Sequence, residues 1–335
     1  MENSFDRFAR NCPGAYFLQA DNSLTDYLRA QSFLASDEII RQITKAGEGN
    51  MNLTLRVQTN QRSFIIKQSR PWVEKYPQLA APWDRVLSEA KFYELVGNLQ
   101  VVASKMPRIL SVDRDSRILL LEDLGTGGDY TSLYQGERLS EAEISALAIY
   151  LSTLHSFVSE PVLANLELRQ LNHAHIFEIP LQSNNGLDLD QITPGLSSVA
   201  NSLKNNLQFR NRAAELGKLY SAEGPTLLHG DFYPGSWLKT NNGLRVIDPE
   251  FAYFGCAEFE VGVLRAHLIL TQNDFAWPVF AEKYRESEGF DPKLMVQFSG
   301  IEIMRRLMGY AQLPLTADLT KKTIWLDLAT AFVLA

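Results

Sequence analysis

The sequence predicts an α+β protein with two lobes, the first rich in strands and the second mainly helical. Apolar and polar residues alternate over 51–57, which is the period of a strand, and the apolar run over 63–67 after a polar turn predicts its antiparallel partner. Beyond residue 128, apolar residues recur at a spacing of three or four, which is typical of helices packed on a core. Strands followed by helices favour α+β over an alternating parallel sheet.

The predicted first lobe covers residues 1–124. It begins with a helix over 22–34, continues with the two strands, and then has a helix over 83–97 and a buried strand over 117–121. The glycine-rich segment that follows, up to Gly128, is the predicted hinge. The second lobe then covers residues 125–335.

The second lobe has three recognisable parts. Ser140 and Glu143 form a capping box that starts a helix with an apolar stripe. Residues 181–195 are polar and rich in turn formers, so we expect a loop there. The segment 227–250 predicts two short strands, and helices return after about residue 258.

Composition excludes several classes of protein. The chain has 335 residues, of which 45% are apolar and 21% charged, as in ordinary globular proteins. A net charge of -7 argues against a nucleic-acid-binding surface. No apolar run is long enough for a membrane span, the charged N-terminus is unlike a secretory signal, and two cysteines make no disulfide framework. We therefore expect a cytoplasmic protein without a membrane or nucleic-acid partner.

Two acidic segments favour phosphoryl transfer. Asp231 lies in a His-Gly-Asp turn after a short apolar strand, where one carboxylate could orient or deprotonate an acceptor hydroxyl. Asp248 and Glu250 flank Pro249 after a second apolar run, and such hard oxygens suit the Mg²⁺ that accompanies ATP. The alternative for the pair is a turn with two solvated acids, and for His229 we expect a structural, buried role.

Three features of the first lobe fit nucleotide binding when they are taken together. Gly47 and Gly49 could let backbone N–H groups approach phosphates, although a plain hairpin turn has the same composition. Lys67 ends a strand and could reach phosphate oxygens, or simply lie at a solvated edge. Glu89 could orient Lys67, or could pair with Arg85 along a helix surface.

Two arginines and three aromatic residues bear on the acceptor. Arg305 and Arg306 lie among apolar residues, where they require an anion, either a nucleotide phosphate or a polar substrate or else surface carboxylates. Near Asp231, three aromatic residues offer apolar surface to an acceptor, although a core position for the tryptophan is an equal alternative. These three are Phe232, Tyr233 and Trp237.

In this order, the motifs resemble the aminoglycoside phosphotransferase superfamily of protein-kinase-like enzymes, and within it the methylthioribose kinase branch. The resemblance spans roughly residues 40 to 310 and rests on six segments. These are the glycine loop Gly47 to Asn52, the lysine strand at Lys67, the hinge Glu122 to Leu124, the turn His229 to Asp231 with Gly235-Ser236, the segment Ile247 to Gly255, and the twin arginines Arg305 and Arg306. The chain departs from the branch at 232–234 and at Glu260, where aspartate is usual.

The resemblance implies a bilobal protein-kinase-like fold with an N-terminal nucleotide lobe. It implies an ATP- and Mg²⁺-dependent kinase whose leading acceptor is 5-methylthioribose. One alternative is a kinase for an amino alcohol or an aminoglycoside. Another is a regulatory pseudokinase, which is suggested by Ser236 in place of a metal-binding asparagine. A homodimer is possible with any of these functions. The implied nucleotide site comprises Gly47, Gly49, Asn50, Lys67, Glu89, Glu122 and Leu124, with Asp248 and Glu250 on the metal and Asp231, Arg305 and Arg306 at the acceptor.

Overall fold

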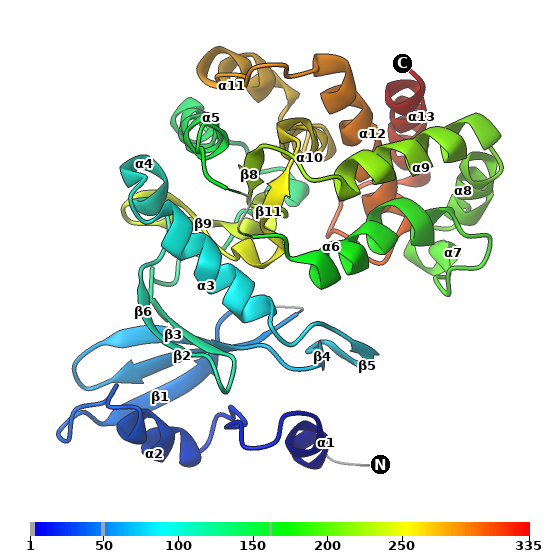
Figure 1. The fold of residues 1–335 in the computed structure, drawn as a ribbon. Helices are drawn as coiled ribbons and strands as arrows, with labels where there is room; N and C mark the ends of the chain where they lie inside the picture. Colours follow the sequence, from blue (N-terminus) through cyan, green and yellow to red (C-terminus); the bar gives the residue numbers. More distant parts are fainter. Residues whose placement is uncertain (1–3, 48–50, 161–162) are drawn as a thin grey trace. The chain divides into compact units, whose positions relative to one another are not determined.

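The structure is a computed structural model that describes residues 4–47, 51–160 and 163–335. The chain forms two compact units (Figure 1). The first unit contains residues 1–128 together with the short segment 248–250, and the second contains residues 129–247 and 251–335. The chain therefore returns to its first unit once, for three residues.

The first unit is built on a five-stranded antiparallel sheet of order β1-β2-β3-β7-β6. Its elements are α1 (Ser4–Asn11), α2 (Ser23–Ala30), β1 (Ile40–Lys45), β2 (Leu53–Thr59), β3 (Ser63–Gln68), β4 (Trp72–Val73), β5 (Tyr76–Ala80), α3 (Arg85–Val96), α4 (Gln100–Ala103), β6 (Ile109–Asp113) and β7 (Ile118–Glu122).

The alternation of side chains along the strands decides what each face of this sheet contacts. Leu55 and Val57 of β2 and Ile66 of β3 pack with Leu24 and Leu28 of α2 in one apolar core. The next residue along β3, Lys67, points to the opposite face because successive side chains of a strand alternate. Helix α3 covers that opposite face, and Figure 1 shows α2 and α3 on the two sides of the sheet.

The hairpin predicted from alternation is confirmed, with β2 and β3 paired antiparallel from Leu53 opposite Gln68 to Gln58 opposite Ser63. The predicted helix over 83–97 is α3, and the predicted strand over 117–121 is β7. Helix α2 ends four residues earlier than the predicted helix over 22–34.

The second unit is mainly helical. Its elements are α5 (Glu141–His155), α6 (Leu166–His173), α7 (Leu189–Ile192), α8 (Leu196–Lys204), α9 (Leu207–Ser221), β8 (Thr226–Leu228), β9 (Trp237–Thr240), β10 (Gly243–Val246), β11 (Tyr253–Gly255), α10 (Ala257–Leu270), α11 (Trp277–Lys283), α12 (Pro292–Met308) and α13 (Leu319–Leu334).

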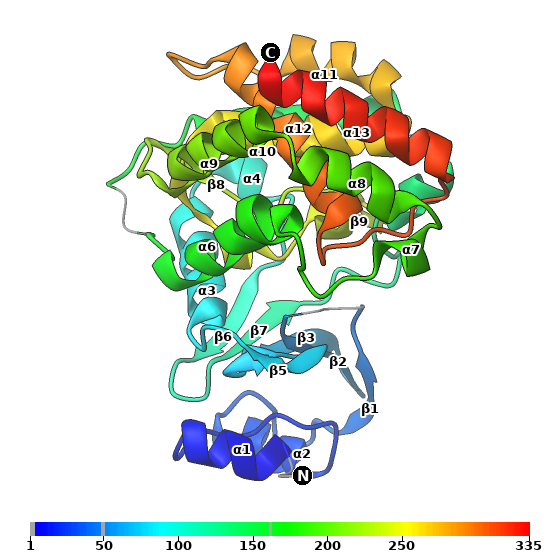
Figure 2. The ribbon, with the colours of Figure 1, turned by 90° about the vertical axis from the view of Figure 1, so that its right-hand side faces the viewer.

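Helix α12 is the centre of the second unit, since it packs against both α10 and α13 (Figure 2). All but a few of its residues are buried, including Glu302, Arg305 and Arg306. Helices α8 and α9 complete one large apolar core with α12 and α13. A helix this deeply buried carries charged side chains only if they are paired.

Two predictions for the second unit need correction. The segment 181–195 is not all loop, because the Asp188 side chain accepts a hydrogen bond from the N–H of Asp190 and starts the single turn α7, whose Leu189 is buried. The segment 227–250 contains three strands rather than two, because β8 pairs with β11 while β9 and β10 form a separate hairpin. The capping box of Ser140 and Glu143 is confirmed at the start of α5.

No helix in the described part of the chain is long and apolar enough to cross a membrane.

Candidate active site

The predicted site residues lie in two groups, one in each unit. In the first unit, the Lys67 ammonium is 2.7 Å from Glu89 Oε2 and 2.5 Å from Asp248 Oδ1. Burial opposes the charge of Lys67, but Asp248, Glu89 and Glu250 together raise its pKa above the ordinary value. The lysine is therefore a cation that contacts the carboxylates of Glu89 and Asp248, with the charge of Glu250 nearby. The alternative pair of Arg85 with Glu89 does not form, because Arg85 donates to backbone carbonyls of residues 51, 70, 72 and 82.

Asp248 and Glu250 differ in environment. The Asp248 side chain is 40% exposed, and its backbone has the left-handed φ of +67°, a conformation that aspartate tolerates better than most residues. Glu250 is buried, accepts a hydrogen bond from Asn52 Nδ2 at 2.8 Å, and lies 3.7 Å from Arg85 Nε. Burial and the neighbouring Asp248 charge raise the pKa of Glu250 to about 8. A divalent cation would offset the electrostatic repulsion between these two carboxylates.

The other predicted nucleotide residues are spread along the first unit. Gly47 has a left-handed φ of +74° just after β1, while Gly49 and Asn50 lie outside the described residues. Glu122 ends β7, where its carboxylate accepts a hydrogen bond from Arg108 Nε at 3.1 Å. Leu124 follows it and is half-buried.

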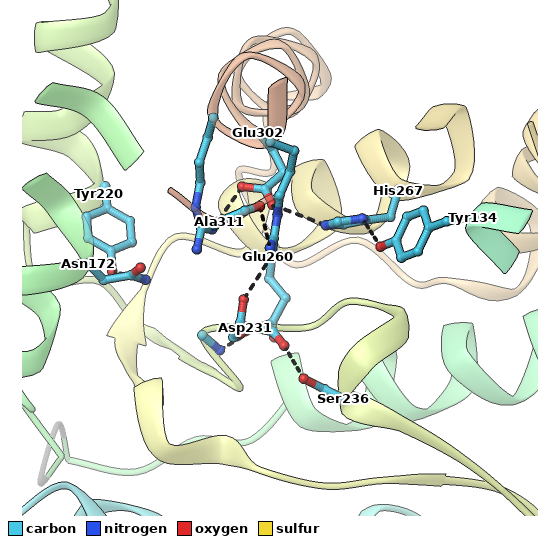
Figure 3. Close-up of polar contacts among 12 residues, drawn as sticks. Tyr134, Asn172, Tyr220, Asp231, Ser236, Glu260, His267, Glu302 and Ala311 are labelled. Atoms are coloured by element: carbon cyan, nitrogen blue, oxygen red, sulfur yellow. Dashed lines mark hydrogen bonds and ion pairs between the residues drawn. The ribbon is translucent and has the colours of Figure 1, made fainter. Parts of the chain in front are cut away.

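In the second unit, a glycine turn places Asp231 after β8. Gly230 has a φ of +86°, and a Cβ there would lie 2.1 Å from the carbonyl oxygen of Phe251, so only glycine fits. The Ser236 hydroxyl donates to the Asp231 carbonyl oxygen at 2.8 Å, which closes the loop (Figure 3). The Asp231 side chain keeps 21% of its surface exposed.

Glu260 of α10 holds the backbone of this turn. One of its carboxylate oxygens accepts from the Gly230 N–H at 2.7 Å, and the other accepts from the His229 N–H at 3.0 Å. His155 Nε2 lies 3.0 Å from the same second oxygen, and His155 Nδ1 lies 2.8 Å from the Tyr284 hydroxyl. His155 is thus a buried histidine with a partner at each ring nitrogen.

Arg305 and Arg306 find their anions within the protein. Arg305 Nη1 is 3.0 Å from Glu302 Oε2, and Arg306 Nε is 2.5 Å from Glu302 Oε1. Arg306 Nη2 also lies 3.5 Å from Asp231 Oδ1. Of the alternatives, carboxylates are therefore correct, although Glu302 is buried rather than on the surface.

Burial and neighbouring charges act on the pKa of Asp231 in opposite directions. Removal of the carboxylate from most of its water raises its pKa, whereas the charges of Arg306 and Arg305 lower it, and the net direction is upward. The carboxylate thus combines a raised proton affinity with a fixed cation beside it. A group of this kind can accept a proton or orient a hydroxyl.

The expectation that Phe232 offers apolar surface to an acceptor is wrong, and of the two alternatives for Trp237 the core position is confirmed. Both are fully buried, and Phe232 stacks on Tyr150 with ring centroids 5.6 Å apart. Tyr233 alone stays partly exposed, and its ring lies 4.5 Å from the Arg306 guanidinium carbon. Phe232 and Trp237 support the loop from the core side, because an apolar ring beside a tight turn is most stable when it is buried.

The sequence of residues 42–292 matches the phosphotransferase enzyme family. This chain belongs to that family. Its activity is accordingly that of a small-molecule kinase, with the bilobal α+β fold of kinase-like proteins.

Members of this family with similar sequences include methylthioribose kinases. The one from Exiguobacterium sibiricum is 27% identical over 327 residues, covering 82% of this chain and 80% of the relative. The one from a Geobacillus species is 24% identical over 314 residues, covering 79% of this chain and 77% of the relative. The chain thus aligns with most of the length of these relatives.

Two solved structures show the same fold. A spectinomycin phosphotransferase in complex with ADP and spectinomycin has a TM-score of 0.56 at 13% identity and covers 96% of this chain and 100% of its own. A choline kinase from Streptococcus pneumoniae has a TM-score of 0.53 at 15% identity and covers 93% of this chain and 99% of its own. At these identities the likeness concerns the fold alone.

The sequence pattern does not identify several residues of the site. Asn52 ends the glycine loop, and Glu260 stands where the family usually has aspartate. Glu302 precedes Arg305 and Arg306 by three and four residues, which is the spacing of a helical ion pair and a signal that the sequence does contain. In the described part of the chain, no cluster of three or more histidine, cysteine, aspartate or glutamate residues is arranged to hold a metal.

Proposed function

We propose that this phosphotransferase uses ATP and Mg²⁺ to phosphorylate a hydroxyl of a small neutral or anionic sugar, with 5-methylthioribose as the leading candidate. The observation that carries the proposal is the pairing of Asp231, in the turn after β8, with the always-charged Arg306. The methylthioribose kinases among its relatives support the choice of sugar.

The proposed nucleotide lobe is residues 1–124, which make up most of the first unit, and it ends in the hinge. Lys67 is held as a cation by the buried carboxylate of Glu89 and the partly exposed carboxylate of Asp248, as a residue that binds α- and β-phosphate oxygens would be. Gly47, Gly49 and Asn50 would contribute the loop over the phosphates, Glu89 would orient Lys67, and Glu122 and Leu124 would contact the base. The ADP in the structure of the spectinomycin phosphotransferase supports a nucleotide in this fold.

The pair of Asp248 and Glu250 suits the metal. Both offer only oxygen, one is exposed and one buried, and their mutual repulsion favours a divalent cation. When bound, Mg²⁺ would neutralise charge on the nucleotide phosphates. The Ser236 hydroxyl donates to the Asp231 carbonyl oxygen at 2.8 Å, so its proposed role is to close the loop that carries Asp231.

The acceptor site is proposed around Asp231 in the second unit. Asp231 would orient the acceptor hydroxyl and take its proton, while Arg306 stabilises the carboxylate. Arg305 Nε is buried without a hydrogen-bond partner among the described residues, so it has a donor to offer an oxygen-rich ligand. Two guanidinium groups beside the acceptor would repel choline, ethanolamine or an aminoglycoside.

The acceptor is tested by a coupled ADP-release assay with methylthioribose, other pentoses, amino alcohols and aminoglycosides, each with and without Mg²⁺. We expect turnover of a neutral sugar that needs Mg²⁺. Preferred turnover of a cationic acceptor would refute the acceptor assignment and leave the kinase activity standing. Absence of turnover together with Mg²⁺-dependent nucleotide binding would favour the pseudokinase alternative.

The role of Asp231 is tested by Asp231→Asn. We expect kcat to fall by about 100-fold or more, within the range of acid–base and positioning effects, with unchanged affinity for ATP. Near-wild-type turnover in a folded variant would remove Asp231 from the mechanism.

Since ATP is a cytoplasmic substrate and both cysteines are free thiols, we place the enzyme in the cytoplasm.

A further inference from the structure

A line of buried polar contacts connects a helical turn near the start of the second unit to Asp231 (Figure 3). The Tyr134 hydroxyl, in the 3-10 turn Thr131–Gln135, lies 2.6 Å from His267 Nδ1. His267 Nε2 lies 3.1 Å from Glu302 Oε1, the oxygen that also accepts from Arg306 Nε. Arg306 then reaches Asp231. Tyr134, His267 and Glu302 are each at most 4% exposed.

The direction of every hydrogen bond in this line follows from the charges. Burial opposes ionisation of Glu302, yet Arg305 and Arg306 hold its pKa well below the ordinary value, so its oxygens only accept. His267 Nε2 must then carry a proton and donate it. Burial lowers the pKa of His267 to about 4, so the ring is neutral, Nδ1 is bare, and the Tyr134 O–H donates to it.

The arrangement leaves Arg306 little freedom. Glu302 Oε1 binds its Nε at 2.5 Å, the Tyr233 ring lies 4.5 Å from its guanidinium carbon, and its Nη1 is 3.4 Å from the Ala311 carbonyl oxygen. The second oxygen of Glu302 is occupied by Arg305 Nη1. If Glu302 rotated, both arginines would move with it.

We infer that Glu302, oriented by His267 and Tyr134, is a positioning residue that holds Arg306 against Asp231. The inference rests on the proposed function, in which Asp231 faces the acceptor hydroxyl. Neither His267 nor Tyr134 touches Asp231 directly, so their effect on the reaction passes through Glu302 and Arg306. None of the three was predicted from the sequence.

Displacement of Arg306 has a predictable effect on the pH profile. The charged and titratable groups that interact with Asp231 are Arg306, Arg305 and Glu302 from α12, His229 from its own loop, and the hydroxyls of Tyr134 and of Tyr220 from α9. The two arginines and His229 lower the pKa of Asp231, and Glu302 raises it. Moving Arg306 away therefore raises that pKa. Because the reactive form is the carboxylate, the acidic limb of kcat/KM then moves to higher pH.

The experiment uses two substitutions that change no charge, Tyr134→Phe and His267→Leu, in the full-length enzyme. We expect kcat/KM for the acceptor to fall by roughly threefold to tenfold in Tyr134→Phe and by roughly tenfold to 100-fold in His267→Leu. Small misplacements near a reacting group have effects of this order. In both variants the acidic limb should move to higher pH, while the KM for ATP stays the same. Tyr130→Phe is the matched control, since the Tyr130 hydroxyl donates to Glu143 outside this line.

Glu302→Gln separates positioning from simple electrostatics. If Glu302 acted only through its charge, its neutralisation would lower the pKa of Asp231 and move the acidic limb to lower pH with activity retained. Positioning predicts the opposite, namely reduced kcat and a limb at higher pH, because an amide cannot accept from both arginines and His267. A limb that moves down, or stays in place in Tyr134→Phe and His267→Leu, overturns the inference.

A measurement on the wild-type enzyme keeps the inference testable if the variants do not fold. The ¹⁵N chemical shifts of the His267 ring should show a protonated Nε2 and a bare Nδ1, without titration between pH 5 and 8. A protonated Nδ1 or a titrating ring would overturn the inference. Failure of the proposed function would give a different result. The wild-type enzyme would show the expected His267 tautomer, but the Asp231→Asn variant would keep its turnover.

Discussion

Shortening Glu260 to aspartate is a severe change in this protein, although the two residues carry the same group. The carboxylate would retract by about 1.5 Å, the length of one carbon–carbon bond. Its present distances of 2.7 Å to the Gly230 nitrogen and 3.0 Å to the His229 nitrogen would then exceed hydrogen-bond range. The contact of 3.0 Å with His155 Nε2 would be lost in the same way.

The magnitude follows from the number and burial of these contacts. A hydrogen bond to a charged group contributes about 1.5–3 kcal/mol, and a buried N–H left without a partner costs about 1–3 kcal/mol. His229 is fully buried, so water cannot replace the lost acceptor. Since α10 and the loop can move partly toward each other, we expect Glu260→Asp to lower the free energy of unfolding by about 2–4 kcal/mol.

Urea unfolding at pH 7, followed by circular dichroism, measures this loss, and kcat is measured on the same samples. The matched control is Glu258→Asp on the same helix, where one oxygen accepts a single hydrogen bond, from the Asp291 N–H at 2.8 Å. We expect the control to lose less than half as much stability and to keep its kcat. Equal losses in the two variants would show that Glu260 does not hold the turn.

Three further predictions concern the charged groups of both units. Lys67→Met should lower the free energy of unfolding by roughly 3 kcal/mol, because it leaves Glu89 buried without its cation, and Lys67→Met with Glu89→Gln should recover part of this in urea unfolding; additive losses would mean that the two side chains do not interact. Glu250→Gln should weaken the effect of Mg²⁺ on ATP affinity in calorimetric titration, and an unchanged effect would make Glu250 a turn residue only. Glu302 has a pKa below the ordinary 4.5 in the folded protein, so its stabilising contribution is present above that pH and lost as the pH falls further; the stability difference between wild type and Glu302→Gln should therefore shrink below pH 4.5, and a difference independent of pH would contradict this.

Local patterns predicted the parts of the fold that depend on neighbours in sequence. Alternation identified the pairing of β2 with β3, and the spacing of Ser140 and Glu143 identified the start of α5. The pairing of Lys67 with Glu89, left open against an alternative, forms because β3 presents the lysine to the face that α3 covers. Each of these contacts follows from the geometry of one strand or helix and its immediate neighbour.

The contacts that escaped prediction join distant segments. Asn52 and Glu250 are 198 residues apart, and Glu260 lies 31 residues from the His229 N–H that it accepts. Nothing in the local pattern says which buried carboxylate will meet which turn. The burial of Phe232 and Trp237 was also open, since an aromatic residue beside a site serves a core and a ligand equally well.

The three residues 248–250 that belong to the first unit impose an order on synthesis. The rest of that unit is complete at residue 128, and Lys67 precedes its partner Asp248 by 181 residues. At about 5–20 residues per second, the ribosome adds the missing segment on the order of ten seconds later. Until then, the nascent first unit has a buried lysine and Glu89 without the second carboxylate that completes their cluster.

A truncated protein that ends near residue 128 would stay in that incomplete state permanently. Its sheet could pair, because all five strands precede residue 128, but its charge cluster could not close. Limited proteolysis in the glycine-rich segment would differ, since both pieces would remain and the segment 248–250 could hold them together. Cleavage of the folded protein near residue 128 can therefore leave the charge cluster complete, whereas truncation of the chain near the same residue cannot.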